Sequence, residues 1–155
     1  MTTYGLLIFD GAEELDFTGP WEVFTTSGML RDEGDTVVLI GESMEPVRCS
    51  KGMRVLPDHT LDSHPDLDVL LIPGGQGTRR EVDNPAVIDW IRSTSAAATW
   101  TTSVCTGALL LHEAGKLFRR EALLRLHVSS PRTRYAIRIR AATRDLSQLL
   151  KRRLR

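Results

Sequence analysis

Three short apolar runs, each followed at once by a turn residue, constrain the fold of this chain most strongly. They cover residues 4–9, 36–40 and 69–72, and aspartate, glycine or proline follows directly. A continuous apolar run of this length is typical of a strand buried on both faces, as in a parallel sheet covered by helices. A β-branched run over residues 99–104 and a weaker run over residues 53–56 predict two further strands.

Helical signals fall between these runs. Thr18 is a candidate N-cap for a helix that follows a loop over residues 12–17, with Pro20 in its first turn. The helical pattern fades between residues 28 and 34, and residues 83–84 supply the cap of a second helix. Strands that alternate with helices at this spacing predict βαβ units and an α/β fold with a mostly parallel sheet.

The composition predicts one packed domain and shows where the charge and glycine content of the chain change. Hydrophobic residues make up 41% of the 155 residues and charged residues 26%, which is ordinary for a globular domain. Residues 1–118 carry 8 basic and 18 acidic side chains, whereas residues 119–155 carry 12 and 2, and every glycine lies at or before Gly115. We therefore expect an α/β domain over residues 1–117 and a divergent basic tail over residues 118–155.

The same survey excludes several classes of protein. No apolar run approaches the ~20 residues of a membrane span, and the N-terminus lacks the pattern of a signal peptide, so a cytoplasmic protein is expected. Cys49 and Cys105 are predicted to be free thiols, and the scattered histidines predict no metal site. Nucleic-acid binding by the basic tail is the less favoured alternative, because aromatic residues do not interleave with its arginines.

A sharp strand-to-helix turn is predicted at Cys105. A strand that ends at Val104, a glycine at Gly107 and an apolar helix from Ala108 together resemble a nucleophile elbow. Backbone N–H groups and the helix dipole at such a turn favour the thiolate and can stabilise a developing anion. The alternative is a small apolar residue that fills the sheet edge, and spacing alone does not decide between the two.

Two more loops are expected at the carboxyl edge of the sheet, where sites of such folds gather. The first carries Asp16, which can accept a proton or can instead satisfy backbone donors at the helix start. The second, residues 73–78, is rich in glycine, so its backbone can approach an oxyanion or can simply form a tight turn. Glu13 and Glu14 are expected to be solvated loop charges.

Taken in order and at this spacing, three motifs resemble the ThiJ/PfpI superfamily and, within it, the isonitrile hydratases. The motifs are Phe9-Asp10-Gly11 with Leu15-Asp16-Phe17-Thr18-Gly19-Pro20, then Leu71-Ile72-Pro73-Gly74-Gly75, then Ser103-Val104-Cys105-Thr106-Gly107-Ala108. The resemblance covers about residues 4–117. It implies a flavodoxin-like three-layer α/β/α sandwich with a mostly parallel sheet, usually a homodimer, and no cofactor.

What the resemblance implies for the chemistry is hydration of a small-molecule isocyanide to an N-substituted formamide. The residues that match the hydratases' catalytic pair and the assisting threonine are Cys105, Asp16 and Thr106. The backbone positions that we assign to substrate or oxyanion binding are Gly19, Gly74 and Gly75. The protease and deglycase-like branches commonly have histidine after the cysteine, so Thr106 disfavours both. A cysteine-based redox or stress sensor and a non-catalytic regulatory domain remain the alternatives.

After residue 117 the family's pattern is lost. The further strands, the glycine-rich segment and the long helix of the family are not visible, so we expect the sandwich to be incomplete at its C-terminus. A reading-frame change in a GC-rich gene, or a truncated relative with a replaced end, would produce such a tail. The hypothesis predicts that another reading frame past residue 117 encodes the missing segment.

Overall fold

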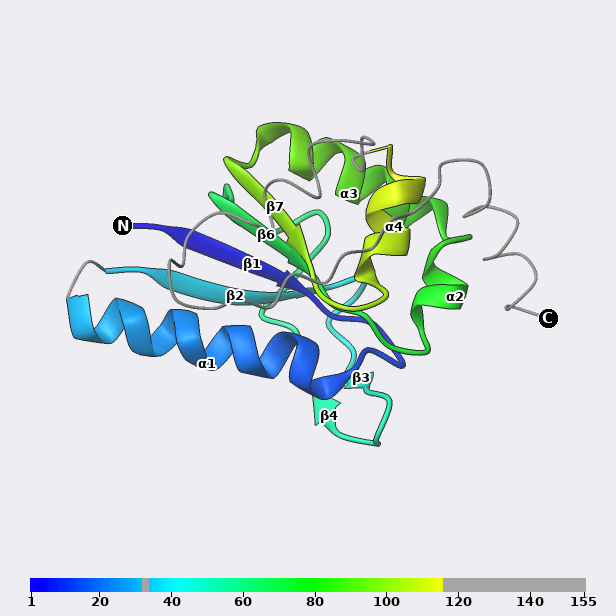
Figure 1. Ribbon diagram of the computed structural model, residues 1–155, viewed down its shortest axis with the longest axis horizontal. Coiled ribbons are helices and arrows are strands. Elements are labelled where there is room, and N and C mark those ends of the chain that lie inside the picture. Colours follow the sequence, from blue (N-terminus) through cyan, green and yellow to red (C-terminus); the bar gives the residue numbers. More distant parts are fainter. Residues whose placement is uncertain (32–33, 116–155) are drawn as a thin grey trace, which may run out of the picture. The chain divides into compact units, whose positions relative to one another are not determined.

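Five parallel strands form the sheet of this protein, in the order β5-β2-β1-β6-β7 (Figure 1). The computed structural model describes residues 1–31 and 34–115, so the expected basic tail lies outside the described residues. The strands are β1 (Thr3–Leu7), β2 (Thr36–Gly41), β5 (His59–Thr60), β6 (Val69–Ile72) and β7 (Trp100–Ser103). A separate hairpin consists of β3 (Val47–Arg48) and β4 (Arg54–Val55).

Helices flank the sheet and confirm the predicted flavodoxin-like α/β fold. They are α1 (Glu14–Arg31), α2 (Thr78–Glu81), α3 (Pro85–Ala97) and α4 (Gly107–Glu113). Helix α1 packs against β1 and β2, whereas α4 packs against β6, β7, α2 and α3. Figure 1 shows α1 and α3 on opposite sides of the strands. Within the described residues, no helix is both long and apolar enough to cross a membrane.

The central strands are buried as the apolar runs predict. Strand β1 pairs with β2 on one side and β6 on the other, and Leu6 lies beside both Leu39 and Leu71. Leu6, Leu70 and other inward residues are fully buried. Because β1 is covered on both faces, its sequence needs apolar residues at successive positions rather than at alternate ones.

Helix α1 begins earlier than the sequence predicts. The expected loop over residues 12–17 is wrong, because the helix starts at Glu14 and includes Thr18, whose hydroxyl donates to the Glu14 carbonyl at 2.8 Å. Carboxylates in the first turn favour this start through the helix dipole. Pro20 therefore lies inside the helix, where it lacks the N–H that would bond the carbonyl of Asp16.

The second expected helix is confirmed as α3, and its cap is Asn84. The Asn84 side chain accepts the Ala86 N–H at 3.1 Å, and Pro85 occupies the first turn. The weak strand expected over residues 53–56 is β4. The two-residue strands β3 and β5 and the short helix α2 were not predicted, because none contains enough residues to show a period.

Candidate active site

The turn between β7 and α4 holds the candidate nucleophile outside the core. Cys105 is exposed, has a φ of 51°, and is the only non-glycine residue with positive φ in the described part of the chain. Such left-handed backbone is strained for a residue with a Cβ. The turn is close-packed: a Cβ at Gly107 would lie 2.3 Å from the Ile72 carbonyl oxygen. The structure thus has the predicted strand-to-helix turn, and an exposed Cys105 does not fill the sheet edge.

Gly74 lies between the groups that the sequence marks as catalytic. Its N–H donates to Asp16 Oδ2 at 3.0 Å. A Cβ built on Gly74 would lie 2.8 Å from Asp16 Oδ2 and 2.7 Å from the backbone nitrogen of Thr106. The same point lies 2.9 Å from Cys105 Cβ. The carboxylate and the cysteine therefore both pack closely against Gly74, and this position has no room for a side chain.

Thr106 joins the turn to the glycine loop through its side chain. Its Oγ1 accepts the Gly75 N–H at 3.0 Å and lies 3.2 Å from Oγ1 of Thr78. The buried Thr78 hydroxyl donates to the Gly75 carbonyl oxygen at 2.8 Å. Thr106 thus occupies the Gly75 N–H, which is not free to bind an oxyanion. Among the described residues, none accepts the backbone N–H of Thr106.

The first turn of α1 is hydrogen-bonded to the glycine loop. Besides the bond from Gly74 to Asp16, the Glu13 N–H donates to the Gly74 carbonyl at 2.9 Å. Ala12 and Gly75 form an isolated antiparallel bridge, and Gly75 has a φ of 119° that suits glycine. Asp16, half-buried, is therefore fixed relative to the loop by its own carboxylate and by the backbone just before it.

The two acidic residues before Asp16 are not the free, solvated charges that the sequence suggested. Glu13 forms an ion pair with Lys51 at 2.7 Å, and Glu14 Oε1 accepts the Lys51 N–H at 2.6 Å. Burial raises the pKa of Glu14, but hydrogen bonds from the backbone of Glu14, Lys51 and Met53 outweigh it and leave this pKa lowered. These contacts join the start of α1 to the β3–β4 hairpin.

The second cysteine is buried, whereas Cys105 is exposed. Cys49 is 4% exposed, and burial, together with the negative charges of Glu14 and Asp10, raises its pKa to about 11. At neutral pH this thiol stays protonated and shielded, so it is neither nucleophilic nor readily modified. Cys49 therefore serves as an internal control for Cys105.

The structure brings together five of the six residues that the sequence assigned to the site. These are Cys105, Asp16, Thr106, Gly74 and Gly75. Gly19 lies in the next turn of α1, where the backbone N–H of a helix bonds its own carbonyls. Thr78 and the hairpin were missed, because no sequence period links them to Cys105. In the described residues, no group of three or more His, Cys, Asp or Glu side chains is placed to hold a metal ion.

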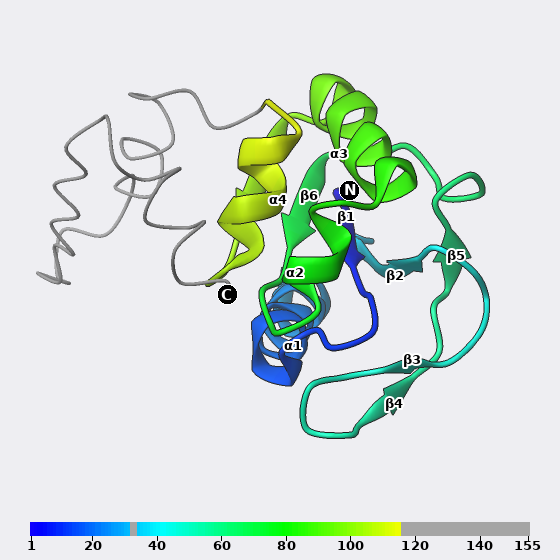
Figure 2. The ribbon, with the colours of Figure 1, turned by 90° about the vertical axis from the view of Figure 1, so that its right-hand side faces the viewer.

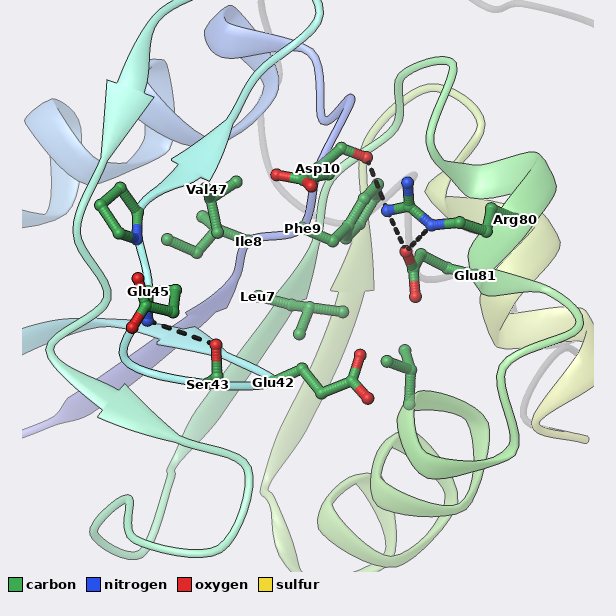
Figure 3. A pocket seen from close by; sticks show the side chains of 12 residues that line it. Leu7, Ile8, Phe9, Asp10, Glu42, Ser43, Glu45, Val47, Arg80 and Glu81 are labelled. Atoms are coloured by element: carbon green, nitrogen blue, oxygen red, sulfur yellow. Dashed lines mark hydrogen bonds and ion pairs between the residues drawn. The ribbon is translucent and has the colours of Figure 1, made fainter.

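A separate hollow of about 450 Å³ lies beyond the carboxyl ends of β1 and β2 (Figure 3). Residues 7–9 line it with apolar side chains, and acidic side chains such as Glu42 and Glu45 stand around them. Arg80 pairs with the buried Glu81 at its edge. None of the catalytic candidates lines this hollow, so it is not part of the site at Cys105.

The parallel sheet with flanking helices defines a flavodoxin-like α/β protein, and the cysteine at a strand-to-helix turn beside an acidic side chain is its candidate site. The chain belongs to the DJ-1/PfpI family, whose sequence model matches residues 5–123. This match confirms the superfamily that the three motifs indicated.

Relatives of the chain include proteins of more than one activity. It is 37% identical over 113 residues to isonitrile hydratase of Pseudomonas putida, covering 73% of this chain and 47% of the hydratase. It is 31% identical over 108 residues to a glutathione-independent glyoxalase of Caenorhabditis elegans, covering 68% of this chain and 55% of that protein.

A solved structure of a ThiJ/PfpI family protein from Pseudomonas syringae superposes with a TM-score of 0.69. The two sequences are 29% identical, and the match covers 75% of this chain and 47% of that one. The chain thus spans about half the length of these three relatives.

Proposed function

We propose that this protein adds water to a small isocyanide and releases an N-substituted formamide, with Cys105 as nucleophile and Asp16 as proton carrier. The observation that carries the proposal is the position of Gly74, where Asp16 Oδ2 and Cys105 Cβ lie 2.8 and 2.9 Å from one point. Asp16 and Cys105 are therefore close neighbours, and a carboxylate and a thiol placed so can act together on one reacting carbon.

In the first half of the proposed reaction, the Cys105 sulfur bonds to the terminal carbon of R–N≡C. Asp16 takes the thiol proton and delivers it to that carbon, which gives a thioimidate, Cys–S–CH=N–R. The Thr106 backbone N–H, free of acceptors among the described residues and 2.7 Å from the same point at Gly74, can donate to the developing negative charge.

In the second half, water adds across the C=N bond, with its oxygen on carbon and one proton on nitrogen. The tetrahedral intermediate then expels the Cys105 thiolate as a C=O bond forms, and Asp16 receives the hydroxyl proton and returns it to sulfur. The product is H–CO–NH–R, and the atoms of one water molecule are consumed. No electron transfer and no cofactor are required.

Thr106 supports hydration over the other chemistries of the family. Its hydroxyl is used to hold Gly75, so this position supplies a fixed contact where a histidine would supply a second base. The 37% identity to a hydratase supports the same choice. Because Cys105 must stay a free thiol, the proposal fits best with the reducing cytoplasm.

The test is formation of N-cyclohexylformamide from cyclohexyl isocyanide. We expect Cys105→Ala to abolish product formation and Asp16→Asn to lower kcat roughly 100-fold or more, the scale of general acid–base catalysis. Cys49→Ala is the matched control and should retain activity, because that thiol is buried and protonated. Equal activity in the Cys105→Ala and Cys49→Ala variants would refute the proposal. Peroxide-sensitive modification of Cys105 without turnover would favour the redox sensor instead.

We further propose that the protein is a homodimer through α1. Leu15, Val23 and Leu30 are 73%, 63% and 82% exposed, and their spacing of eight and seven residues places them on one face of the helix. The opposite face buries Phe17 against the sheet. A helix that is apolar on both faces needs a second partner, and a second copy of this chain is the partner that we propose.

A further inference from the structure

The β3–β4 hairpin lies near the start of α1 (Figures 1 and 2). It is hydrogen-bonded to the turn that leads into this helix. The Gly11 N–H donates to the Arg48 carbonyl at 2.8 Å, and the Ser50 N–H donates to the Ala12 carbonyl at 2.8 Å. The Ser50 hydroxyl adds a bond to the Gly11 carbonyl at 2.7 Å. Backbone and side chain of the hairpin therefore fix the turn before α1 begins.

The hairpin tip is also bound to the first residues of α1. Glu14, the first residue of the helix, accepts the Lys51 N–H at 2.6 Å, and the Lys51 ammonium lies 2.7 and 2.8 Å from the two Glu13 oxygens. The other oxygen of Glu14, Oε2, is buried. Glu14 is thus enclosed by the hairpin only two residues before Asp16.

The same short segment carries the contacts that hold the glycine loop. The Gly77 N–H donates to the Gly11 carbonyl at 3.0 Å, and the Glu13 N–H donates to the Gly74 carbonyl at 2.9 Å. The Gly74 N–H then donates to Asp16 at 3.0 Å. A path of hydrogen bonds therefore runs from the hairpin through residues 11–14 to the backbone of Gly74, which lies beside both Asp16 and Cys105.

We propose that the hairpin is a positioning element for the candidate active site and that Glu14 is its main positioning residue. By anchoring the hairpin tip to the first turn of α1, Glu14 fixes the distance between the Asp16 carboxylate and Gly74. The role in catalysis rests on the hydratase function proposed above, whereas the role in fixing Gly74 does not.

The experiment compares Glu14→Ala with Glu22→Ala, which removes the same side chain and charge from an exposed position on the same helix. Glu22 contacts only the Thr26 hydroxyl among the interactions described here. Hydrogen exchange is measured by NMR at the Gly74 amide, at the hairpin amides of residues 50–51, and at core amides of β1. We expect Glu14→Ala to speed exchange at Gly74 and in the hairpin at least tenfold, and the Glu22→Ala protein to match the wild type.

Faster exchange in the hairpin with unchanged exchange at Gly74 would overturn the proposal, since the hairpin would then be released without moving the site. Unchanged exchange in the hairpin would overturn the role of Glu14. Ser50→Ala, which removes the bond to Gly11, is the second variant in case Glu14→Ala unfolds, and the same increase is expected at Gly74.

Activity supplies the readout that a purely structural contact would not move. We expect Glu14→Ala to lower kcat for isocyanide hydration roughly tenfold while KM changes less than about twofold, because misplacing a reacting group by a fraction of an ångström lowers the rate of the chemical step. A loss of folding stability alone would reduce the amount of folded protein. It would not change the ratio of kcat between the Glu14→Ala and wild-type proteins when the two are compared at equal folded concentration. A wild-type protein without hydration activity would refute the proposed function, and the exchange data would still decide the role of the hairpin.

Discussion

Gly74 has no side chain, and three groups use the space that a side chain would fill. The Asp16 carboxylate, the Thr106 nitrogen and Cys105 Cβ all lie within van der Waals distance of that point. At the scale of single residues, the site therefore requires glycine at position 74 as well as the reactive side chains. A substitution at this position changes geometry without removing any functional group.

Gly74→Ala is expected to reduce kcat roughly 100-fold or more, as misplacement of reacting groups by about 1 Å does elsewhere. The added Cβ would push Asp16 and Cys105 apart, since each lies closer than 3.0 Å. Assays of formamide formation, with circular dichroism to verify folding, test this expectation. An active Gly74→Ala protein would show that the two side chains do not share this space.

The pKa of Glu14 gives a prediction about acid stability. Because its pKa is lowered in the folded chain, Glu14 stabilises the fold above its ordinary pKa of about 4.3, and this contribution is lost as the pH falls through the folded value. The melting temperature should therefore fall more between pH 7 and pH 3 in the wild type than in Glu14→Ala. Equal falls in the two proteins would contradict this contribution.

At the scale of elements, the site is built where the ends of β6, β7 and the start of α1 meet. Thr106, at the start of α4, holds the loop after β6 through the Gly75 N–H and Thr78. No single element contains the site. The positions of the site residues therefore depend on hydrogen bonds between elements. The Thr106 hydroxyl takes part in two of these bonds, to Gly75 and Thr78.

Thr106→Val keeps the shape of the side chain and removes this hydroxyl. We expect kcat to fall roughly tenfold, because the Gly75 N–H and the buried Thr78 hydroxyl each lose a partner. Thr106→Ser should recover most of the activity. If valine and serine at this position give the same kcat, the hydroxyl does not act in this way.

The sequence predicted the buried strands and the cysteine turn well because both leave a local pattern. Continuous apolar runs follow from burial on two faces, and a small glycine must follow the turn because Gly107 packs on Ile72. The start of α1 was misplaced because Thr18 and Pro20 have the residue types of a helix start, while Glu14 and Asp16 in fact begin it. The hairpin contacts escaped prediction, since Lys51 and Glu14 are 37 positions apart and no period connects them.

At the scale of the whole molecule, the parallel order of the strands gathers the site at one edge. Asp16, Gly74 and Cys105 follow β1, β6 and β7, and the carboxyl ends of neighbouring parallel strands meet on one side of the sheet. This much could be predicted from the sequence. Gly74 was also assigned to the site from the sequence, but its place between Asp16 and Cys105 could not be predicted, because it depends on approaches of less than 3 Å.

The exposed face of α1 predicts the oligomeric state. If a second copy covers Leu15, Val23 and Leu30, then Val23→Glu with Leu30→Glu should convert a dimer into a monomer, because burying two carboxylates in an apolar contact is costly. Analytical ultracentrifugation of both proteins measures this change. Ala96→Glu with Ala97→Glu is the control, because it adds the same charge at exposed positions of α3, on the other side of the strands from α1. A wild-type protein that sediments as a monomer at all concentrations would exclude the dimer.

The left-handed backbone of Cys105 has a consequence for the history of the chain. Its strain, about 1 to 3 kcal/mol for a residue of this kind, destabilises every folded molecule whether or not a substrate is present. Glycine at this position would relieve the strain, so a population freed from the need for the thiol would gain stability by losing it. On the proposed function, the reactivity of the thiol is what offsets this loss of stability.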